Sequence, residues 1–181
     1  CYYCPNSLHP TPTEFMSEEI FQKAVERLKE IDFRGIVTYN LYNEPLLDKR
    51  LSSFVRHVRK ELPFTISKIL TNGDNLTVDL ARELIDAGVV EFFITIHDFD
   101  PKPFLEKLAP VLKAFPKYIY ITTYHDDPLS NRGGAIKVKN QFKMESCIIG
   151  TLPVSKNGDV ILCCDDYFKK YRMGNIMEKS L

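Results

Sequence analysis

The sequence predicts an α/β fold in which parallel strands alternate with helices, followed by a small C-terminal module. Between residues 17 and 124, helical apolar periodicity alternates with short runs of β-branched and aromatic residues, which is typical of repeated β–α–β units. Beyond residue 125 this alternation stops, and an Asn-Gly turn separates two β-rich runs. The alternation by itself fits either an open doubly wound sheet or part of a barrel.

The N-terminal 16 residues are expected to form a loop, because three prolines there disfavour a regular helix or a central strand: Pro5, Pro10 and Pro12. The first long helix is expected to run from the N-cap Ser17 to Ile31. Glu18 and Glu19 stand in its first turn, where the helix dipole favours acidic side chains.

Four strands and three more helices are expected to follow. The expected strands cover residues 36–42, 65–70, 91–96 and 118–124. The expected helices cover residues 48–61, 77–87 and 101–114, and Gly88 is a C-terminal glycine cap of the middle one.

The C-terminal module is expected to begin after a turn at residues 131–134. Its hairpin would pair Leu152–Ser155 with Val160–Cys163 around the turn at residues 156–159. With the boundary near residues 135–146, the predicted domains are residues 1–135 and 136–181.

Composition excludes several classes of protein. The chain has 181 residues, 44% of them hydrophobic, and 24 acidic residues balance 24 basic ones. It lacks the basic excess of a nucleic-acid-binding protein, so no nucleic-acid partner is expected. It also lacks an apolar run long enough to cross a bilayer, so no membrane partner is expected. Its five cysteines gather at the two ends, which favours thiolates binding a metal or cluster in a reducing cytoplasm.

Polar side chains follow each expected strand. The segments concerned are residues 42–45, 71–73, 97–98 and 124–126. Because ligands bind at the carboxyl ends of parallel strands, we expect these segments to share one functional rim. For His97 and His125 a plain pocket or surface role is the favoured interpretation. The loop with Cys1 and Cys4 precedes the first helix and is expected at the same rim.

Three motifs in this order resemble those of radical S-adenosylmethionine (SAM) enzymes. Cys1-Tyr2-Tyr3-Cys4 resembles the second half of C-x-x-x-C-x-x-C, Asn43-Glu44-Pro45-Leu46 resembles G-G-E-P, and Thr71-Asn72-Gly73 resembles T-N-G. The chain is therefore identified as a member of this family. The resemblance implies a partial (β/α)6 TIM-type barrel whose first strand and first motif cysteine lie upstream of residue 1.

The resemblance also implies cofactors and site residues. Cys1 and Cys4 would be the catalytic ligands of a [4Fe-4S] cluster, on which SAM is cleaved to a 5′-deoxyadenosyl radical that abstracts hydrogen from the substrate. Glu44 would bind the ammonium group of SAM, Asn72 its ribose or carboxylate, and Arg132 its carboxylate. The full set of expected SAM-binding residues is Tyr3, Asn43, Glu44, Pro45, Thr71, Asn72, Gly73 and Arg132.

The C-terminal part resembles the auxiliary-cluster extension called SPASM, or its shorter form, twitch. Ten residues separate Cys147 from Gly158, and four separate Gly158 from Cys163. The resemblance implies that Cys147 and Cys163 bind an auxiliary iron–sulfur cluster, with further cysteines following residue 181. Cys164 is interpreted as a spare core thiol.

The expected function is that of a radical SAM oxidoreductase, with peptide or protein modification (a maturase) placed first. A dehydrogenase of a small carbohydrate or aminocyclitol is the alternative. A further alternative is a structural zinc module on Cys1, Cys4, Cys163 and Cys164, although adjacent cysteines suit one tetrahedral zinc poorly. A thioredoxin-like redox role fits poorly, because Pro5 directly follows Cys4. The expected partners are a peptide or small-molecule substrate and an electron donor of flavodoxin or ferredoxin type.

Overall fold

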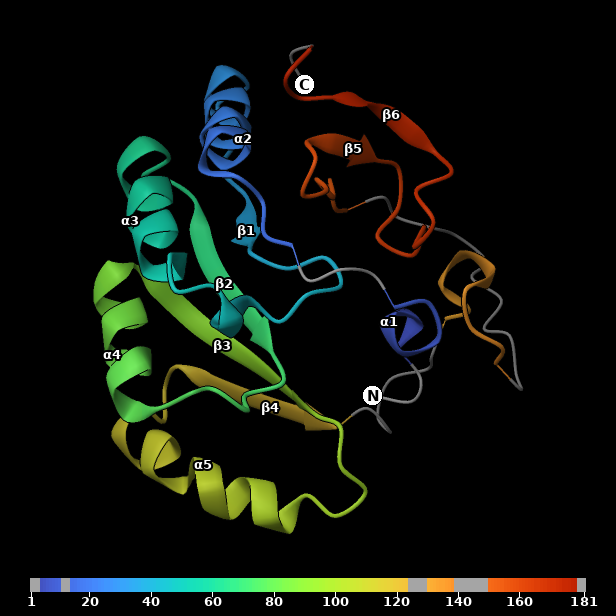
Figure 1. Ribbon diagram of the computed structural model, residues 1–181. Coiled ribbons are helices and arrows are strands. Elements are labelled where there is room, and N and C mark those ends of the chain that lie inside the picture. Colours follow the sequence, from blue (N-terminus) through green and yellow to red (C-terminus); the bar gives the residue numbers. More distant parts are fainter. Residues whose placement is uncertain (1–3, 11–13, 124–129, 139–149, 179–181) are drawn as a thin grey trace. The chain divides into compact units, whose positions relative to one another are not determined.

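The computed structural model describes residues 4–10, 14–123, 130–138 and 150–178. The chain divides into two compact units (Figure 1). We call Leu28–Asp126 the sheet unit. The other unit, which we call the thiol unit, consists of Cys1–Arg27 and Asp127–Leu181. Cys1, Tyr3 and Cys147 lie outside the described residues. The predicted boundary near residues 135–146 stays a prediction.

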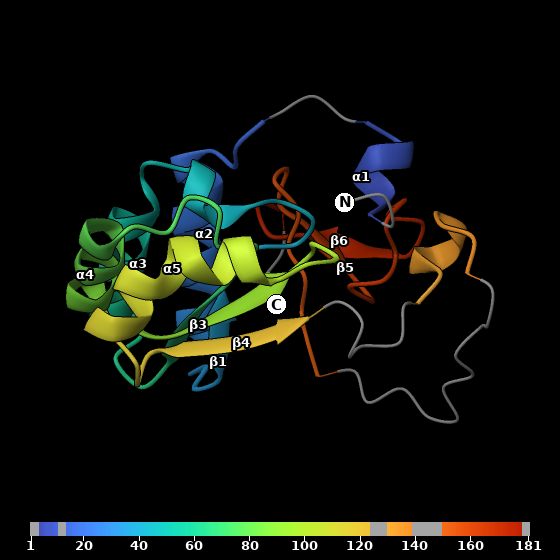
Figure 2. The same cartoon turned by 90° about the horizontal axis from the view of Figure 1, so that it is seen from below.

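The sheet unit holds four parallel strands in sequential order: β1 (Ile36–Thr38), β2 (Ile66–Thr71), β3 (Val89–Ile96) and β4 (Ile119–Thr123). The helices that connect them lie on one face of the sheet (Figure 1, Figure 2): α3 (Leu51–Glu61), α4 (Val78–Ala87) and α5 (Lys102–Ala114). Helices on both faces would indicate a doubly wound sheet, whereas this arrangement is an arc of a barrel. The predicted α/β fold with a partial barrel is confirmed.

The core of this unit fills the space between the sheet and its helices. Side chains alternate between the two faces of a strand, so the fully buried Phe92, Ile94 and Ile96 of β3 share one face. They belong to one apolar cluster with Val55 of α3 and Leu84 of α4. This cluster fixes the strands, and therefore fixes the loops at their carboxyl ends.

Local sequence signals place most helix ends where they were predicted. In α2 (Glu18–Glu30), the amide of Ile20 donates to the Ser17 hydroxyl at 3.2 Å, which confirms the N-cap. Gly88 ends α4 with φ of 128° and donates its amide to carbonyls of the last turn, which confirms the glycine cap.

Strand β1 is shorter than the predicted 36–42, because a side chain takes over its backbone groups. Asn43 Oδ1 accepts the amide of Leu41 at 2.8 Å, and Asn43 Nδ2 donates to the carbonyl of Tyr39 at 3.4 Å. A side chain that satisfies the backbone locally ends the strand. The 3₁₀ helix η1 (Pro45–Leu47) follows, so the chain turns immediately after the strand.

The thiol unit contains α1 (Pro5–Leu8), η2 (Arg132–Gly134), β5 (Asp159–Ile161) and β6 (Arg172–Asn175). The prediction of an unbroken N-terminal loop was wrong, because Pro5 occupies the first position of α1. A proline there loses no hydrogen bond, since the first amides of a helix have no partner within it.

The predicted C-terminal hairpin is only partly correct. Its two arms meet in a single antiparallel bridge between Val154 and Val160. The main partner of β5 is β6, in antiparallel register from Asp159 opposite Asn175 to Ile161 opposite Arg172. The fold class is nevertheless the predicted one, a parallel sheet followed by a small antiparallel one. In the described ranges, no helix has the length and apolar character needed to span a bilayer.

Candidate active site

Glu44 connects two strand ends of the sheet unit. Its side chain caps η1 by accepting the amide of Leu46 at 3.0 Å through Oε1. The same oxygen accepts the hydroxyl of Thr71 at 2.6 Å, and Oε2 accepts the amide of Asn72 at 2.9 Å. The carboxylate that follows β1 is therefore held by the end of β2. The predicted meeting of these motifs at one rim is observed.

The segment Thr71–Gly73 combines an anchor with a tight turn. The hydroxyl of Thr71 donates to Glu44 and accepts the amide of Gly73 at 2.9 Å. Gly73 has φ of 75°, and a Cβ atom there would lie 2.8 Å from the ring of Phe104 and 3.0 Å from Ile94. Only glycine suits this position, because the backbone is left-handed and packs directly on the core.

The Glu44 carboxylate retains the capacity to bind an ammonium group. A carboxylate offers about four acceptor positions, two on each oxygen. The three donors Leu46, Thr71 and Asn72 leave one position on Oε2. Charge-assisted bonds of this kind are about twice as strong as neutral ones. The donor set therefore fits the amino group of SAM.

The neighbours of Glu44 have defined tasks. Pro45 is buried at the first position of η1, where its fixed φ suits the turn. The side-chain amide of Asn43 bonds to the backbone of Leu41 through its oxygen and to that of Tyr39 through its nitrogen, so Asn43 shapes the loop. Asn72 Oδ1 accepts the amide of Asp74 at 2.9 Å, which leaves its amide nitrogen to donate to a ligand oxygen.

His97 follows β3 at this same rim. Burial lowers the pKa of its imidazole, while the carboxylates of Asp74, Asp98 and Glu44 act in the opposite direction. These carboxylates come from three successive strand ends, so the rim is a polar cluster that carries negative charge.

The sheet face opposite the helices contains side chains that motif reasoning did not single out. Lys68 and Glu91 are opposite each other in β2 and β3 and form an ion pair at 2.9 Å. Next along the strands, Phe93 stacks on Tyr120 of β4 with ring centroids 4.9 Å apart. Strict alternation within each strand could have identified this face, because its residues fall between the buried ones.

The described cysteines all lie in the thiol unit. Cys4 immediately precedes α1, and burial together with the Cys4 sulfur raises the pKa of Tyr167. Cys163 Sγ accepts the amide of Asp165 at 3.4 Å, the kind of contact that thiolate ligands of clusters receive. The unit thus offers thiols that fit iron–sulfur ligation. The expected closeness of Cys4 to Glu44 stays a prediction.

The position of Cys164 differs from the prediction. It was interpreted as a core thiol, but the residue is exposed. Partial burial of its thiol raises the pKa, and the carboxylate of Asp165 raises it further. The residue therefore stands at the surface beside Cys163.

Arg132 lies on η2 in the thiol unit. It has φ of 51°, and its NH1 atom pairs with Asp165 Oδ1 at 2.5 Å. At the next residue, a Cβ atom on Gly133 would lie 3.1 Å from the carbonyl oxygen of Asp165. Arg132 is therefore positioned next to the Cys163 loop. Its predicted contact with the SAM carboxylate stays a prediction.

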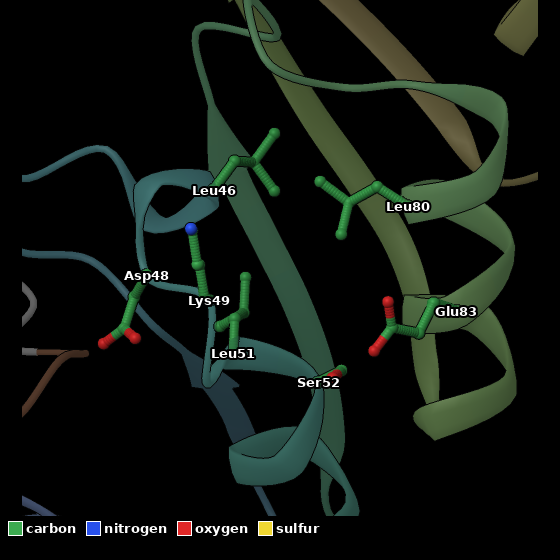
Figure 3. Close-up of a pocket in the computed structure, with 7 residues that line it drawn as sticks. All are labelled: Leu46, Asp48, Lys49, Leu51, Ser52, Leu80 and Glu83. Atoms are coloured by element: carbon green, nitrogen blue, oxygen red, sulfur yellow. The ribbon is translucent and has the colours of Figure 1, made fainter.

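A separate hollow of about 250 Å³ lies on the helix side of the sheet unit (Figure 3). Leu46 and Leu51 face Leu80 and Glu83 of α4 across it. Its lining includes neither Glu44 nor Asn72, so the hollow is distinct from the rim.

Comparisons with known proteins identify the family of this chain. Residues 1–121 match the model of the radical SAM superfamily. The chain is 31% identical over its full length to the S-adenosyl-L-methionine-dependent 2-deoxy-scyllo-inosamine dehydrogenase of Niallia circulans, of which 74% is covered.

Two solved structures resemble the whole chain. The crystal structure of BtrN in complex with AdoMet and 2-DOIA has a TM-score of 0.88 at 32% identity, with 99% of this chain and 74% of that chain covered. BtrN in an open conformation has a TM-score of 0.73 at 26% identity, with 99% and 70% covered.

Proposed function

Since the chain belongs to the radical SAM superfamily, we propose that it is a SAM-dependent dehydrogenase of an aminocyclitol or a similar small polyol. The observation that carries this proposal is the 31% identity to an aminocyclitol dehydrogenase over the whole chain, including the C-terminal module. The family implies a [4Fe-4S] cluster and SAM. The chain is thus a radical SAM enzyme, and its substrate is the part that we propose.

Peptide modification, the function placed first from sequence, is not supported. The relatives named above concern a small aminocyclitol, and one was crystallised with 2-DOIA and AdoMet. The zinc-module alternative is not supported either, because Cys1 and Cys4 fall within residues 1–121, which match a family that implies an iron–sulfur cluster.

In this proposal, the chain's own groups bind and orient the reactants. Cys1 and Cys4 would hold the cluster, and Glu44 would bind the ammonium of SAM with its remaining acceptor position. The Asn72 amide nitrogen would donate to an oxygen of SAM. When bound, the cluster and SAM supply a 5′-deoxyadenosyl radical that removes a hydrogen atom from a substrate carbon.

The substrate step is then a two-electron oxidation of a secondary alcohol. The carbon loses a hydrogen atom first, and the hydroxyl proton and one electron leave next to form a ketone. Cys147 and Cys163 would hold an auxiliary cluster, which would supply a one-electron acceptor. The amide of Asp165 would stabilise the Cys163 thiolate.

The substrate is proposed to face the exposed side of the sheet. The pair of Lys68 and Glu91 and the aromatic stack of Phe93 and Tyr120 lie on that face. A ring with an ammonium group and several hydroxyls matches a surface that combines a carboxylate with aromatic rings.

The test uses the protein reconstituted anaerobically with iron and sulfide. Incubation with SAM, dithionite and 2-deoxy-scyllo-inosamine should release 5′-deoxyadenosine and a ketone in equal amounts. If the enzyme releases 5′-deoxyadenosine but forms a ketone from no aminocyclitol in a panel, the proposed substrate class is rejected. The family assignment would stand.

A variant pair tests the role of Glu44. E44A should weaken SAM binding about tenfold or more, because the lost bond is charge-assisted. E83A is the matched control, since Glu83 is 50% exposed on α4, away from the rim. Equal SAM affinity of E44A and the unmodified enzyme would remove the role of Glu44.

A further inference from the structure

Tyr167 connects the loop that follows Cys163 to the helix that follows Cys4. Its hydroxyl donates to the carbonyl of His9 at 2.8 Å and also to Asn6 Oδ1 at 3.0 Å, which makes a three-centre bond. Asn6 belongs to α1, and His9 is the C-cap of that helix. The side chain of Tyr167 therefore joins two parts of the thiol unit that lie far apart in the sequence.

Backbone hydrogen bonds determine where Tyr167 lies relative to Cys163. The carbonyl of Cys163 accepts the amide of Asp166 at 3.1 Å, and its sulfur accepts the amide of Asp165 at 3.4 Å. The amide of Tyr167 donates in turn to the carbonyl of Asp165 at 2.9 Å. Because these bonds form one short turn, a group that holds the Cys163 sulfur also holds Tyr167.

Helix α1 depends on contacts from outside itself. It has four residues, and a helix this short is unstable alone. The amide of Ser7 donates to the carbonyl of Cys4 at 3.0 Å, so the first turn includes the proposed cluster ligand. At the other end, His9 Nε2 donates to the carbonyl of Ala135 at 3.2 Å, and the His9 ring packs on Phe168 with centroids 5.1 Å apart. Residues of the C-terminal part therefore hold the helix that follows Cys4.

We propose that Tyr167 is a positioning residue through which the auxiliary cluster and the [4Fe-4S] cluster at Cys4, here called the primary cluster, stabilise each other. A cluster bound to Cys163 orders the turn that carries Tyr167. The Tyr167 hydroxyl then holds α1 and keeps Cys4 in place for the primary cluster. The effect is reciprocal, because one coupling free energy acts on both binding events. This inference rests on the ligand roles of Cys4 and Cys163 in the proposed function, and it is independent of the substrate.

The test measures how fast a chelator removes the primary cluster from the anaerobically reconstituted enzyme. Electron paramagnetic resonance of the reduced protein counts this cluster, since its signal is the one that changes when SAM binds the open iron. Y167F keeps the ring but removes the hydroxyl, and should lose the cluster about threefold to tenfold faster, the range expected for one neutral hydrogen bond. Y171F is the matched control and should equal the unmodified enzyme, since Tyr171 bonds through its backbone and its side chain is 67% exposed.

A cysteine variant separates coupling from simple support of α1 by Tyr167. In C163A the auxiliary cluster no longer orders the turn, so Y167F should speed the loss of the primary cluster much less in this background. If C163A does not fold, C4A gives the reciprocal measurement. Iron then reports only the auxiliary cluster, and Y167F should speed its loss less than it does in the unmodified enzyme.

The outcomes separate this inference from the proposed function. Equal cluster loss in Y167F and the unmodified enzyme, or an equal acceleration in Y171F, would overturn the coupling. The same acceleration by Y167F with and without Cys163 would overturn it too, because Tyr167 would then only support α1. If the unmodified enzyme forms no ketone but shows the Tyr167 effect, the proposed dehydrogenase function fails and the coupling stands. If it forms the ketone while Y167F keeps its cluster, the coupling alone fails.

Discussion

The sheet unit and the thiol unit are stabilised in different ways. In the sheet unit, strands and helices share one apolar cluster that includes Ile69 and Phe92, both fully buried. The thiol unit has short elements, and polar contacts join segments that are far apart in sequence. Examples are His9 with the carbonyl of Ala135, Tyr167 with Asn6, and Arg132 with Asp165.

This difference indicates which unit would gain more stability from a bound cofactor. The core of the sheet unit already positions Glu44, Thr71 and Asn72, so that rim is preorganised without a ligand. The thiol unit contains Cys4 and Cys163, which are proposed cluster ligands. Because metal binding and folding are coupled, that unit should gain more stability from reconstitution. Four variants with progressively smaller expected effects test this contrast between the units.

The largest effect is expected from F92A in the core of the sheet unit. Removing a fully buried ring should lower the free energy of unfolding by about 3–5 kcal/mol. V90A is the control in the same strand, since Val90 is 48% exposed, and should cost far less. Urea unfolding followed by circular dichroism measures both. Similar losses in the two variants would contradict the assignment of the core face.

A smaller loss is expected from T71V at the rim. The isosteric change removes a buried hydroxyl that bonds both Glu44 and the amide of Gly73, and should cost about 1–3 kcal/mol in the free energy of unfolding. T71S keeps the hydroxyl and should recover most of the loss. SAM affinity, measured by calorimetry, should fall in T71V because Glu44 loses a donor that orients it. Unchanged affinity would show that Glu44 is oriented without Thr71.

A pH effect is expected from His97. Burial lowers the pKa of its imidazole below the usual 6.5 or so, so the unfolded chain binds this proton more tightly than the folded one. Stability should therefore be lost as the pH falls from about 7 through the folded pKa. H97Q removes the titrating group, so its stability should fall less over the same range. Parallel pH–stability curves for the two proteins would contradict the lowered pKa.

The smallest effect is expected from R132A in the thiol unit. The pair of Arg132 and Asp165 is about one-third exposed on each side, so its loss should cost at most about 1 kcal/mol in the free energy of unfolding. D165N should behave alike. A loss in R132A as large as that in F92A would break the contrast between the two units.

How much of the site was predictable depends on how far apart its parts lie in sequence. The motifs at residues 43–46 and 71–73 were identified from the sequence, and their placement at strand ends followed from the alternation of elements. The sequence did not indicate that Glu44 would accept a bond from Thr71, because residues 27 positions apart meet only after the strands align. The early end of β1 was missed since the Asn43 side chain, rather than a propensity, terminates it.

By itself, the sequence determined the order of strands and helices, the helix caps at Ser17 and Gly88, and the residue types available at the rim. These features follow from local periodicity and local hydrogen bonds, both of which involve residues close together in the sequence. The folded chain alone shows that β5 pairs with β6 in addition to its bridge with the nearer arm, and that the carbonyl of Tyr171 accepts the amide of Leu162. Strand partners are chosen by packing and by backbone groups of distant segments, which no local pattern encodes.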